Sequence, residues 1–250
     1  MTRRRAQAST PLLAGAIAAG IFDVDGVLLA SPHERAWREA LQGFADQAKF
    51  TTAMYQSEVA GKPRMSGALA ALQALGVPNA AQRAEAYAEN KQRRLEVLIG
   101  AGAVSAFPDA LRFVQAVKAL GFPMAVASSS KNANEMMRRI RLDDQHSLFD
   151  VFDANVCGRD LPAGKPDPAI FLLAAAELPA APAKCFVVED APAGIEAARA
   201  GGMAALGVAR LDDAKSLWAA GADLVVTSLD DIDLDQLCIG RLCRRIYEKS

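Results

Sequence analysis

Residues 17–27 read IAAGIFDVDGV, an apolar run that stops at two acidic residues, Asp23 and Asp25. The apolar part is typical of a buried strand and the acidic part of the polar turn after it. The acidic pair also begins like a calcium loop, but positions five and six of that loop hold Val27 and Leu28 instead of a ligand and glycine. We therefore predict a first core strand that delivers two carboxylates to the edge of a sheet.

The composition is that of a globular chain. Of 250 residues, 52% are hydrophobic and 23% are charged, and the formal net charge is −1. The length allows one or two domains, and the near-zero charge argues against nucleic-acid binding. Four cysteines without a C-x-x-C pair and only two histidines argue against a structural zinc site or a disulfide scaffold. We expect reduced thiols and a cytoplasmic monomer with no membrane partner.

The N-terminus imitates a signal peptide, because arginines at 3–5 precede an apolar run that reaches Ile21. The run is short, is broken by Gly15 and Gly20, and continues into the acidic turn instead of a cleavage site. We therefore expect it to supply the first strand and not a secretion signal. No stretch of the sequence is long and apolar enough to span a bilayer.

Two patterns follow the first strand. Residues 34–100 have helical spacing, and we predict helices at 34–49, 66–75 and 81–99. From about 107, strands and helices alternate. The predicted strands are 124–127, 151–154, 185–188, 204–208 and 224–226, and the predicted helices are 108–120, a segment after 132, 167–177 and 192–200.

Such alternation predicts an α/β fold, with a parallel sheet and helices on both of its faces. The helical block interrupts it, so we predict a core formed by residues 1–32 and 106–250 and an inserted helical cap at 33–105.

Polar side chains follow several of the predicted strands. They are Asp23 and Asp25, Ser128 to Asn132, Lys165, and Glu189 with Asp190. In open parallel sheets, ligands bind beyond the carboxyl ends of the strands. Strand ends are commonly polar, which could account for one or two of these loops. Carboxylates combined with a lysine and hydroxyl groups suit Mg²⁺ shared with a phosphate, and a carboxylate facing phosphorus can act as a nucleophile.

Four of these segments, in order, resemble the motifs of the haloacid dehalogenase-like superfamily of aspartate-dependent phosphotransferases. The motifs are Asp23-Val-Asp25-Gly-Val27, Ser128, Lys165-Pro166 and Glu189-Asp190, and the resemblance covers about residues 15–228. It implies a Rossmann-like core with an inserted α-helical cap.

The resemblance also implies roles. Asp23 would be the nucleophile. Asp25 would be the general acid and base, and its backbone carbonyl would ligate Mg²⁺. Ser128 and Lys165 would hold phosphoryl oxygens. Glu189 and Asp190 would complete the metal site.

A finer resemblance is to the β-phosphoglucomutase-like subgroup and its phosphatase relatives. It implies substrate contacts at His33, Arg64, Lys91, Ser129, Ser130, Lys131 and Asn132. Simpler interpretations stay open: a helix cap for His33, a solvated charge for Lys91, a surface charge for Arg64 and loop filling for Ser129. The acidic residues at 230–235 are expected to form a solvated face.

The expected function is Mg²⁺-dependent phosphoryl transfer on a small phosphorylated sugar or related phosphomonoester through an aspartyl phosphate. The subgroup implies conversion of β-glucose 1-phosphate to glucose 6-phosphate, with a sugar bisphosphate as activator. A sugar-phosphate phosphatase is the alternative, and a non-catalytic binding protein a remote one. Asp25 and the Glu189-Asp190 pair argue against a 2-haloacid dehalogenase.

Overall fold

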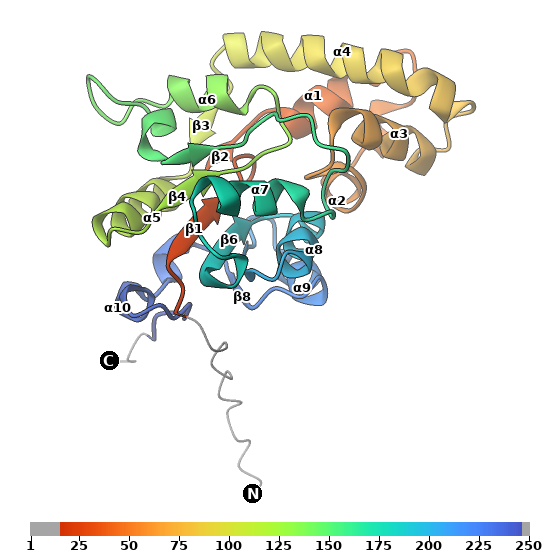
Figure 1. Ribbon diagram of the computed structural model, residues 1–250. Coiled ribbons are helices and arrows are strands. Elements are labelled where there is room, and N and C mark those ends of the chain that lie inside the picture. Colours follow the sequence, from red (N-terminus) through yellow and green to blue (C-terminus); the bar gives the residue numbers. More distant parts are fainter. Residues whose placement is uncertain (1–15, 247–250) are drawn as a thin grey trace, which may run out of the picture.

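A computed structural model describes residues 16–246, and its centre is a six-stranded parallel sheet (Figure 1). In spatial order its strands are β5 (Ala154–Asn155), β4 (Met124–Val126), β1 (Ala19–Phe22), β6 (Cys185–Glu189), β7 (Ala204–Val208) and β8 (Leu224–Val226). The first strand of the chain therefore lies in the middle of the sheet, between β4 and β6. The α/β fold predicted from the sequence is confirmed.

Helices cover both faces of the sheet because neighbouring residues of each strand point in opposite directions. Phe22 lies in an apolar cluster with Phe113 and Phe186, whereas Ile21 lies in a second cluster with Phe171. The first cluster receives side chains from α5 (Pro108–Ala119), α6 (Ala133–Arg139) and α10 (Leu234–Cys238). The second receives them from α7 (Ala169–Glu177), α8 (Pro192–Ala200) and α9 (Ala214–Ala219).

A helical insert leaves the sheet after β1. It contains α1 (His33–Glu39), α2 (Thr52–Met54), a π-helical turn (Tyr55–Val59), α3 (Arg64–Ala74) and α4 (Ala80–Gly100). The chain enters and leaves it through an antiparallel pair, β2 (Leu29–Ala30) with β3 (Ser105–Ala106), which we call the hinge pair. Figure 1 shows α4 running across the end of the molecule where the sheet strands finish.

The insert has an apolar cluster of its own. Trp37, Leu41, Leu72 and Tyr87 are buried there, and the Tyr87 hydroxyl donates a hydrogen bond to the Trp37 carbonyl at 2.9 Å. A separate cluster supports treating the insert as a cap domain. Its predicted limits, 33–105, stay a prediction.

Two predicted elements are wrong in extent. The helix predicted at 34–49 ends at Glu39, because Gly43 adopts a positive φ of 82° and Asp46 caps a separate 3₁₀ turn at Gln47–Lys49. The strand predicted at 151–154 starts only at Ala154. Before it, a capping box between Ser147 and Asp150 holds a 3₁₀ turn at Leu148–Val151. Further 3₁₀ turns lie at Pro182–Lys184 and Leu229–Asp231.

The signal-like arginines at 3–5 lie outside the described residues. Within residues 16–246, no helix combines the length and the apolar character that a membrane crossing requires.

The turn after β1 is closed by its own backbone. The Val24 carbonyl accepts hydrogen bonds from the amides of Leu28 and Leu29, and the Gly26 amide donates to the Leu29 carbonyl at 2.9 Å. Gly26 has a φ of 82°, and a Cβ added there would lie 1.9 Å from the Asp190 carboxylate. Glycine therefore allows this turn to pass directly against the end of β6.

We expect Gly26→Ala to destabilise the protein more than Gly43→Ala does. Both glycines have a φ of 82°, but a Cβ at Gly43 meets nothing within 4 Å. Gly43→Ala should cost about 1–3 kcal/mol through backbone strain alone. Gly26→Ala should cost at least about 1 kcal/mol more because Asp190 must move. Urea denaturation measures both variants, and equal losses would refute the close approach of this turn to Asp190.

Candidate active site

Three neighbouring strands end at the same level and present the predicted polar residues together. Asp23 directly follows β1, Ser128 comes two residues after the end of β4, and Glu189 ends β6. The Asp23 amide donates to the Val188 carbonyl at 3.1 Å, and the Ala127 amide donates to the Phe22 carbonyl at 2.9 Å. This is the position in an open parallel sheet where ligands bind.

Lys165 joins two of the carboxylates. It comes from the loop between β5 and α7, and its Nζ lies 2.5 Å from Asp23 Oδ1 and also contacts Glu189 Oε1. The Lys165 side chain is only 1% exposed. Burial by itself lowers the pKa of an ammonium, but the charges of Asp23 and Glu189 raise the pKa of Lys165 above its usual value. Lys165 is therefore a permanent cation against the Asp23 carboxylate.

Glu189 is held from several sides. Its Oε2 accepts the backbone amides of Asp190 at 3.0 Å and Ala191 at 3.1 Å, while its other oxygen contacts Lys165. A Cβ on Gly194 would lie 2.0 Å from the Glu189 carboxylate, so α8 packs directly against it. Glu189 thus fixes the position of Lys165 as well as adding negative charge.

The described residues include one group of carboxylates suited to a metal ion: Asp23, Glu189 and Asp190, whose ligand oxygens lie within 4.8 Å of one another. The three carboxylates lie near a single ammonium, that of Lys165, so ionising all three would leave two negative charges uncompensated. Burial, together with the neighbouring carboxylates, raises the pKa values of Asp23 and Asp190, although Lys165 opposes this rise. All-oxygen donors with an excess of two negative charges fit a hard divalent cation such as Mg²⁺.

Asp25 stands beside this cluster with one oxygen unused. Its Oδ2 accepts the Ser128 hydroxyl at 3.5 Å. Its Oδ1 is buried and has no hydrogen-bond partner among the described residues, although His33 Nε2 lies 3.4 Å away. A buried carboxylate oxygen without a partner costs free energy, so its presence next to Asp23 points to a group that bonds it during function.

His33 and Lys91 extend from Asp25 into the cap. Lys91 Nζ lies 2.9 Å from His33 Nδ1. Burial lowers the pKa of His33 to about 4 even though Asp25 opposes the shift, and burial lowers the pKa of Lys91 to about 7. His33 is therefore neutral near pH 7. Lys91 is 4% exposed, so the alternative of a solvated helix charge is wrong.

A cavity of about 460 Å³ lies between the core and the insert. All the residues predicted to bind substrate line it: His33, Arg64, Lys91, Ser129, Ser130, Lys131 and Asn132. Two of these residues make polar contacts with other residues of the cavity wall. Asn132 exchanges hydrogen bonds with the Gln92 amide on α4, and exposed Lys131 pairs with Asp160 at 2.8 Å.

The insert also closes over the cavity through its loop at 60–63. Pro63 packs so closely on Gly164 that a Cβ there would lie 2.1 Å from the proline ring. A Cβ on Gly61 would lie 3.8 Å from the Lys165 side chain. The cap loop therefore sits directly over the lysine of the core.

Comparison with known proteins identifies the family. A family model described as a haloacid dehalogenase-like hydrolase matches residues 17–202. The chain belongs to the haloacid dehalogenase-like hydrolase family. It is accordingly an enzyme of the phosphotransferase and phosphatase class.

The relatives include both mutases and phosphatases. A β-phosphoglucomutase of Mycobacterium bovis is 32% identical over 241 residues, which cover 86% of this chain and 91% of that one. A phosphorylated carbohydrates phosphatase of Thermotoga maritima is 32% identical over 211 residues, with 82% and 92% covered. The crystal structure of an archaeal β-phosphoglucomutase from a Pyrococcus strain superposes with a TM-score of 0.69 at 32% identity, covering 88% and 96%.

Some cavity residues of this haloacid dehalogenase-like enzyme were not anticipated. Tyr55 and Gln56, from the π-helical turn, line the cavity, and Gln56 Oε1 is buried without a partner among the described residues. Burial and the charges of Asp25 and Asp190 raise the pKa of Tyr55 well above its usual value. Tyr55 is therefore a neutral donor near the acidic cluster. The sequence offers no motif for either residue, since π turns have no sequence signature.

We expect acid to destabilise the wild-type protein more than a His33→Gln variant. The pKa of His33 is about 4 in the folded state against 6.5 for the free side chain, so between these values the unfolded chain binds the extra proton. His33 therefore makes stability fall as pH drops from 6.5 towards 4. From pH 7.5 to 5, its contribution should be about 1–2 kcal/mol.

Urea denaturation at the two pH values measures this difference. His146→Gln is the matched control because the His146 side chain is 61% exposed, and it should keep a pH dependence close to that of the wild type. An unchanged pH dependence in His33→Gln would show that His33 is not buried in its neutral form.

Proposed function

We propose that this enzyme transfers phosphoryl groups on a small phosphorylated sugar through an aspartyl phosphate on Asp23, as a β-phosphoglucomutase that converts β-glucose 1-phosphate to glucose 6-phosphate. The observation that carries the proposal is the pairing of Asp23 with buried Lys165 beneath a covered cavity. Names of relatives at 32% identity support the sugar-phosphate substrate class.

Asp23 is suited to nucleophilic attack. Lys165 holds its Oδ1 at 2.5 Å and fixes the direction of the carboxylate. In the reaction, an Asp23 oxygen bonds to phosphorus while the bond from phosphorus to the sugar oxygen breaks. Lys165 and Ser128 would bind the phosphoryl oxygens and offset their charge. Mg²⁺, held by Asp23 and Asp190, would neutralise the repulsion between carboxylate and phosphate.

Asp25 is suited to move the proton. Its unpartnered Oδ1 would, in the protonated form, donate to the sugar oxygen as that oxygen leaves phosphorus. The resulting carboxylate would accept the proton of the next attacking hydroxyl. His33 would steer this carboxylate from 3.4 Å, and Lys91 would in turn hold His33.

A mutase needs a second site for the phosphate that is not reacting. Arg64, Lys131 and the Ser130–Asn132 loop supply cationic and hydrogen-bonding groups on the cavity wall. They would hold either end of a glucose bisphosphate while the other end faces Asp23. The cap loop over Lys165 would exclude water, which otherwise hydrolyses the aspartyl phosphate. A sugar-phosphate phosphatase is the second candidate, favoured by the relative from Thermotoga maritima.

We expect phosphorus NMR to distinguish the two candidates in one assay. The enzyme is incubated with Mg²⁺, β-glucose 1-phosphate and a trace of glucose 1,6-bisphosphate. Glucose 6-phosphate should accumulate, and Asp23→Asn should form none. Inorganic phosphate as the main product would establish a phosphatase instead. Turnover by Asp23→Asn would contradict the assignment of the nucleophile.

A further inference from the structure

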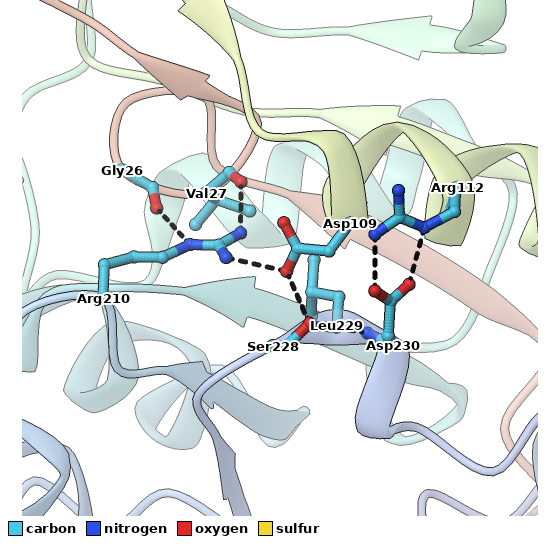
Figure 2. Close-up of polar contacts among 8 residues, drawn as sticks. All are labelled: Gly26, Val27, Asp109, Arg112, Arg210, Ser228, Leu229 and Asp230. Atoms are coloured by element: carbon cyan, nitrogen blue, oxygen red, sulfur yellow. Dashed lines mark hydrogen bonds and ion pairs between the residues drawn. The ribbon is translucent and has the colours of Figure 1, made fainter.

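Arg210 lies beyond the residues that the family model matches and two residues after β7, yet it reaches the turn that carries Asp25 (Figure 2). Its side chain is 13% exposed and its guanidinium lies 4.1 Å from the centre of the Phe107 ring. Phe107 directly follows the hinge pair, and its amide donates to the Leu28 carbonyl at 3.0 Å. Arg210 thus sits where the core, the turn after β1 and the hinge pair meet.

The guanidinium binds two carbonyls of that turn. Its Nε donates to the Gly26 carbonyl at 3.4 Å and its Nη2 to the Val27 carbonyl at 3.2 Å (Figure 2). Other carbonyls of the turn accept backbone amides, but no backbone amide within residues 16–246 binds these two. Arg210 is therefore what satisfies the two carbonyls that follow Asp25.

The opposite side of the guanidinium is anchored to the scaffold. Nη1 donates to Asp109 Oδ2 at 2.7 Å, and the same oxygen accepts the Leu229 amide at 2.8 Å and the Ser228 hydroxyl at 3.2 Å. Burial raises the pKa of the Asp109 carboxyl, but the hydrogen bonds from Arg210 and Leu229 outweigh it and leave the pKa below its usual value. Asp109 is thus an ionised anchor in the first turn of α5.

We propose that Arg210 is a positioning residue for the phosphoryl transfer. It ties the Gly26 and Val27 carbonyls to Asp109 and so holds the Asp25 carboxylate in register with Asp23. This inference rests on the proposed function, because it assigns the purpose of the turn to the proton transfer by Asp25. The position needs arginine, since only its planar fork can donate to two carbonyls and a carboxylate at once.

Arg210→Lys and Arg210→Met separate the two contacts. Lysine can keep the ion pair with Asp109 but cannot reach both carbonyls. Methionine loses the ion pair and both hydrogen bonds to the carbonyls. The matched controls are Arg112→Lys and Arg112→Met. Arg112 lies on α5, the helix that also carries Asp109. It pairs with Asp230 through Nε at 2.9 Å and Nη2 at 2.5 Å, but contacts no part of the turn (Figure 2).

We expect kcat to fall by about 10–100-fold in both Arg210 variants, the range for a displaced proton donor. KM should stay within about threefold of the wild-type value. The variants lose proton transfer, which acts only in the transition state, and keep the contacts that bind the substrate. The loss should be larger for the sugar phosphate, whose leaving oxygen needs the proton of Asp25, than for p-nitrophenyl phosphate, whose nitrophenolate leaves without one. Arg210→Lys should recover thermal stability relative to Arg210→Met without recovering kcat, and the Arg112 variants should match the wild type in kcat.

Three results would overturn the inference. Wild-type kcat in Arg210→Lys would reduce Arg210 to a structural ion pair. A loss in KM confined to the sugar phosphate would make it a substrate contact, since Arg210 also lines the cavity. An equal fall of kcat in the Arg112 variants would show that losing either ion pair of α5 loosens the fold in general.

A readout without substrate distinguishes a failure of the positioning by Arg210 from a failure of the proposed function. Hydrogen exchange of the amides of residues 24–29 should be faster in both Arg210 variants than in the wild type or the Arg112 variants. If the wild type turns over no phosphomonoester, the proposed function fails, and unchanged exchange in the Arg210 variants would separately refute the positioning of the turn.

Discussion

The contact of the Lys165 ammonium with Asp23 and Glu189 is the interaction on which the rest of the site depends. Moving one buried cation and several buried carboxylates out of water is costly unless they compensate each other closely. Glu189 compensates the charge of Lys165 with one carboxylate oxygen and accepts two backbone amides with the other. Removing the lysine would leave Asp23 beside two buried carboxylates and would raise the pKa of Asp23 still further, towards its protonated, non-nucleophilic form.

The parallel sheet brings the two carboxylates that bind Lys165 together with few residues. Because β4, β1 and β6 are neighbours in register, Ser128, Asp23 and Glu189 meet without any long loop. Catalytic groups on strand ends are held more firmly than groups on free loops. The insert then adds His33, Lys91 and the loop that covers Lys165. In the proposed function, the core would supply the chemistry, and the insert would supply substrate contacts and exclude water.

Much of the core site could be predicted from the sequence, because each group directly follows an apolar run. Asp23, Ser128, Glu189 and Asp190 needed only the rule that strand ends of a parallel sheet meet at one edge. The burial of Lys91 could not be predicted, since a lysine on a polar helix is normally solvated.

The role of Arg210 could not be predicted either, because its partners are backbone carbonyls more than 180 residues earlier in the chain. The expectation of a solvated acidic face at 230–235 was too simple, since Asp230 pairs with Arg112 and Asp233 caps α10.

Chemical trapping of the phosphoenzyme tests the central claim most directly. The enzyme is mixed with Mg²⁺ and a phosphoryl donor, quenched, and reduced with borohydride, which converts an aspartyl phosphate to homoserine. Peptide mass spectrometry should find homoserine at position 23 in the wild type and none there in Lys165→Met. A label on another residue, or an active enzyme with no label at Asp23, would contradict the account.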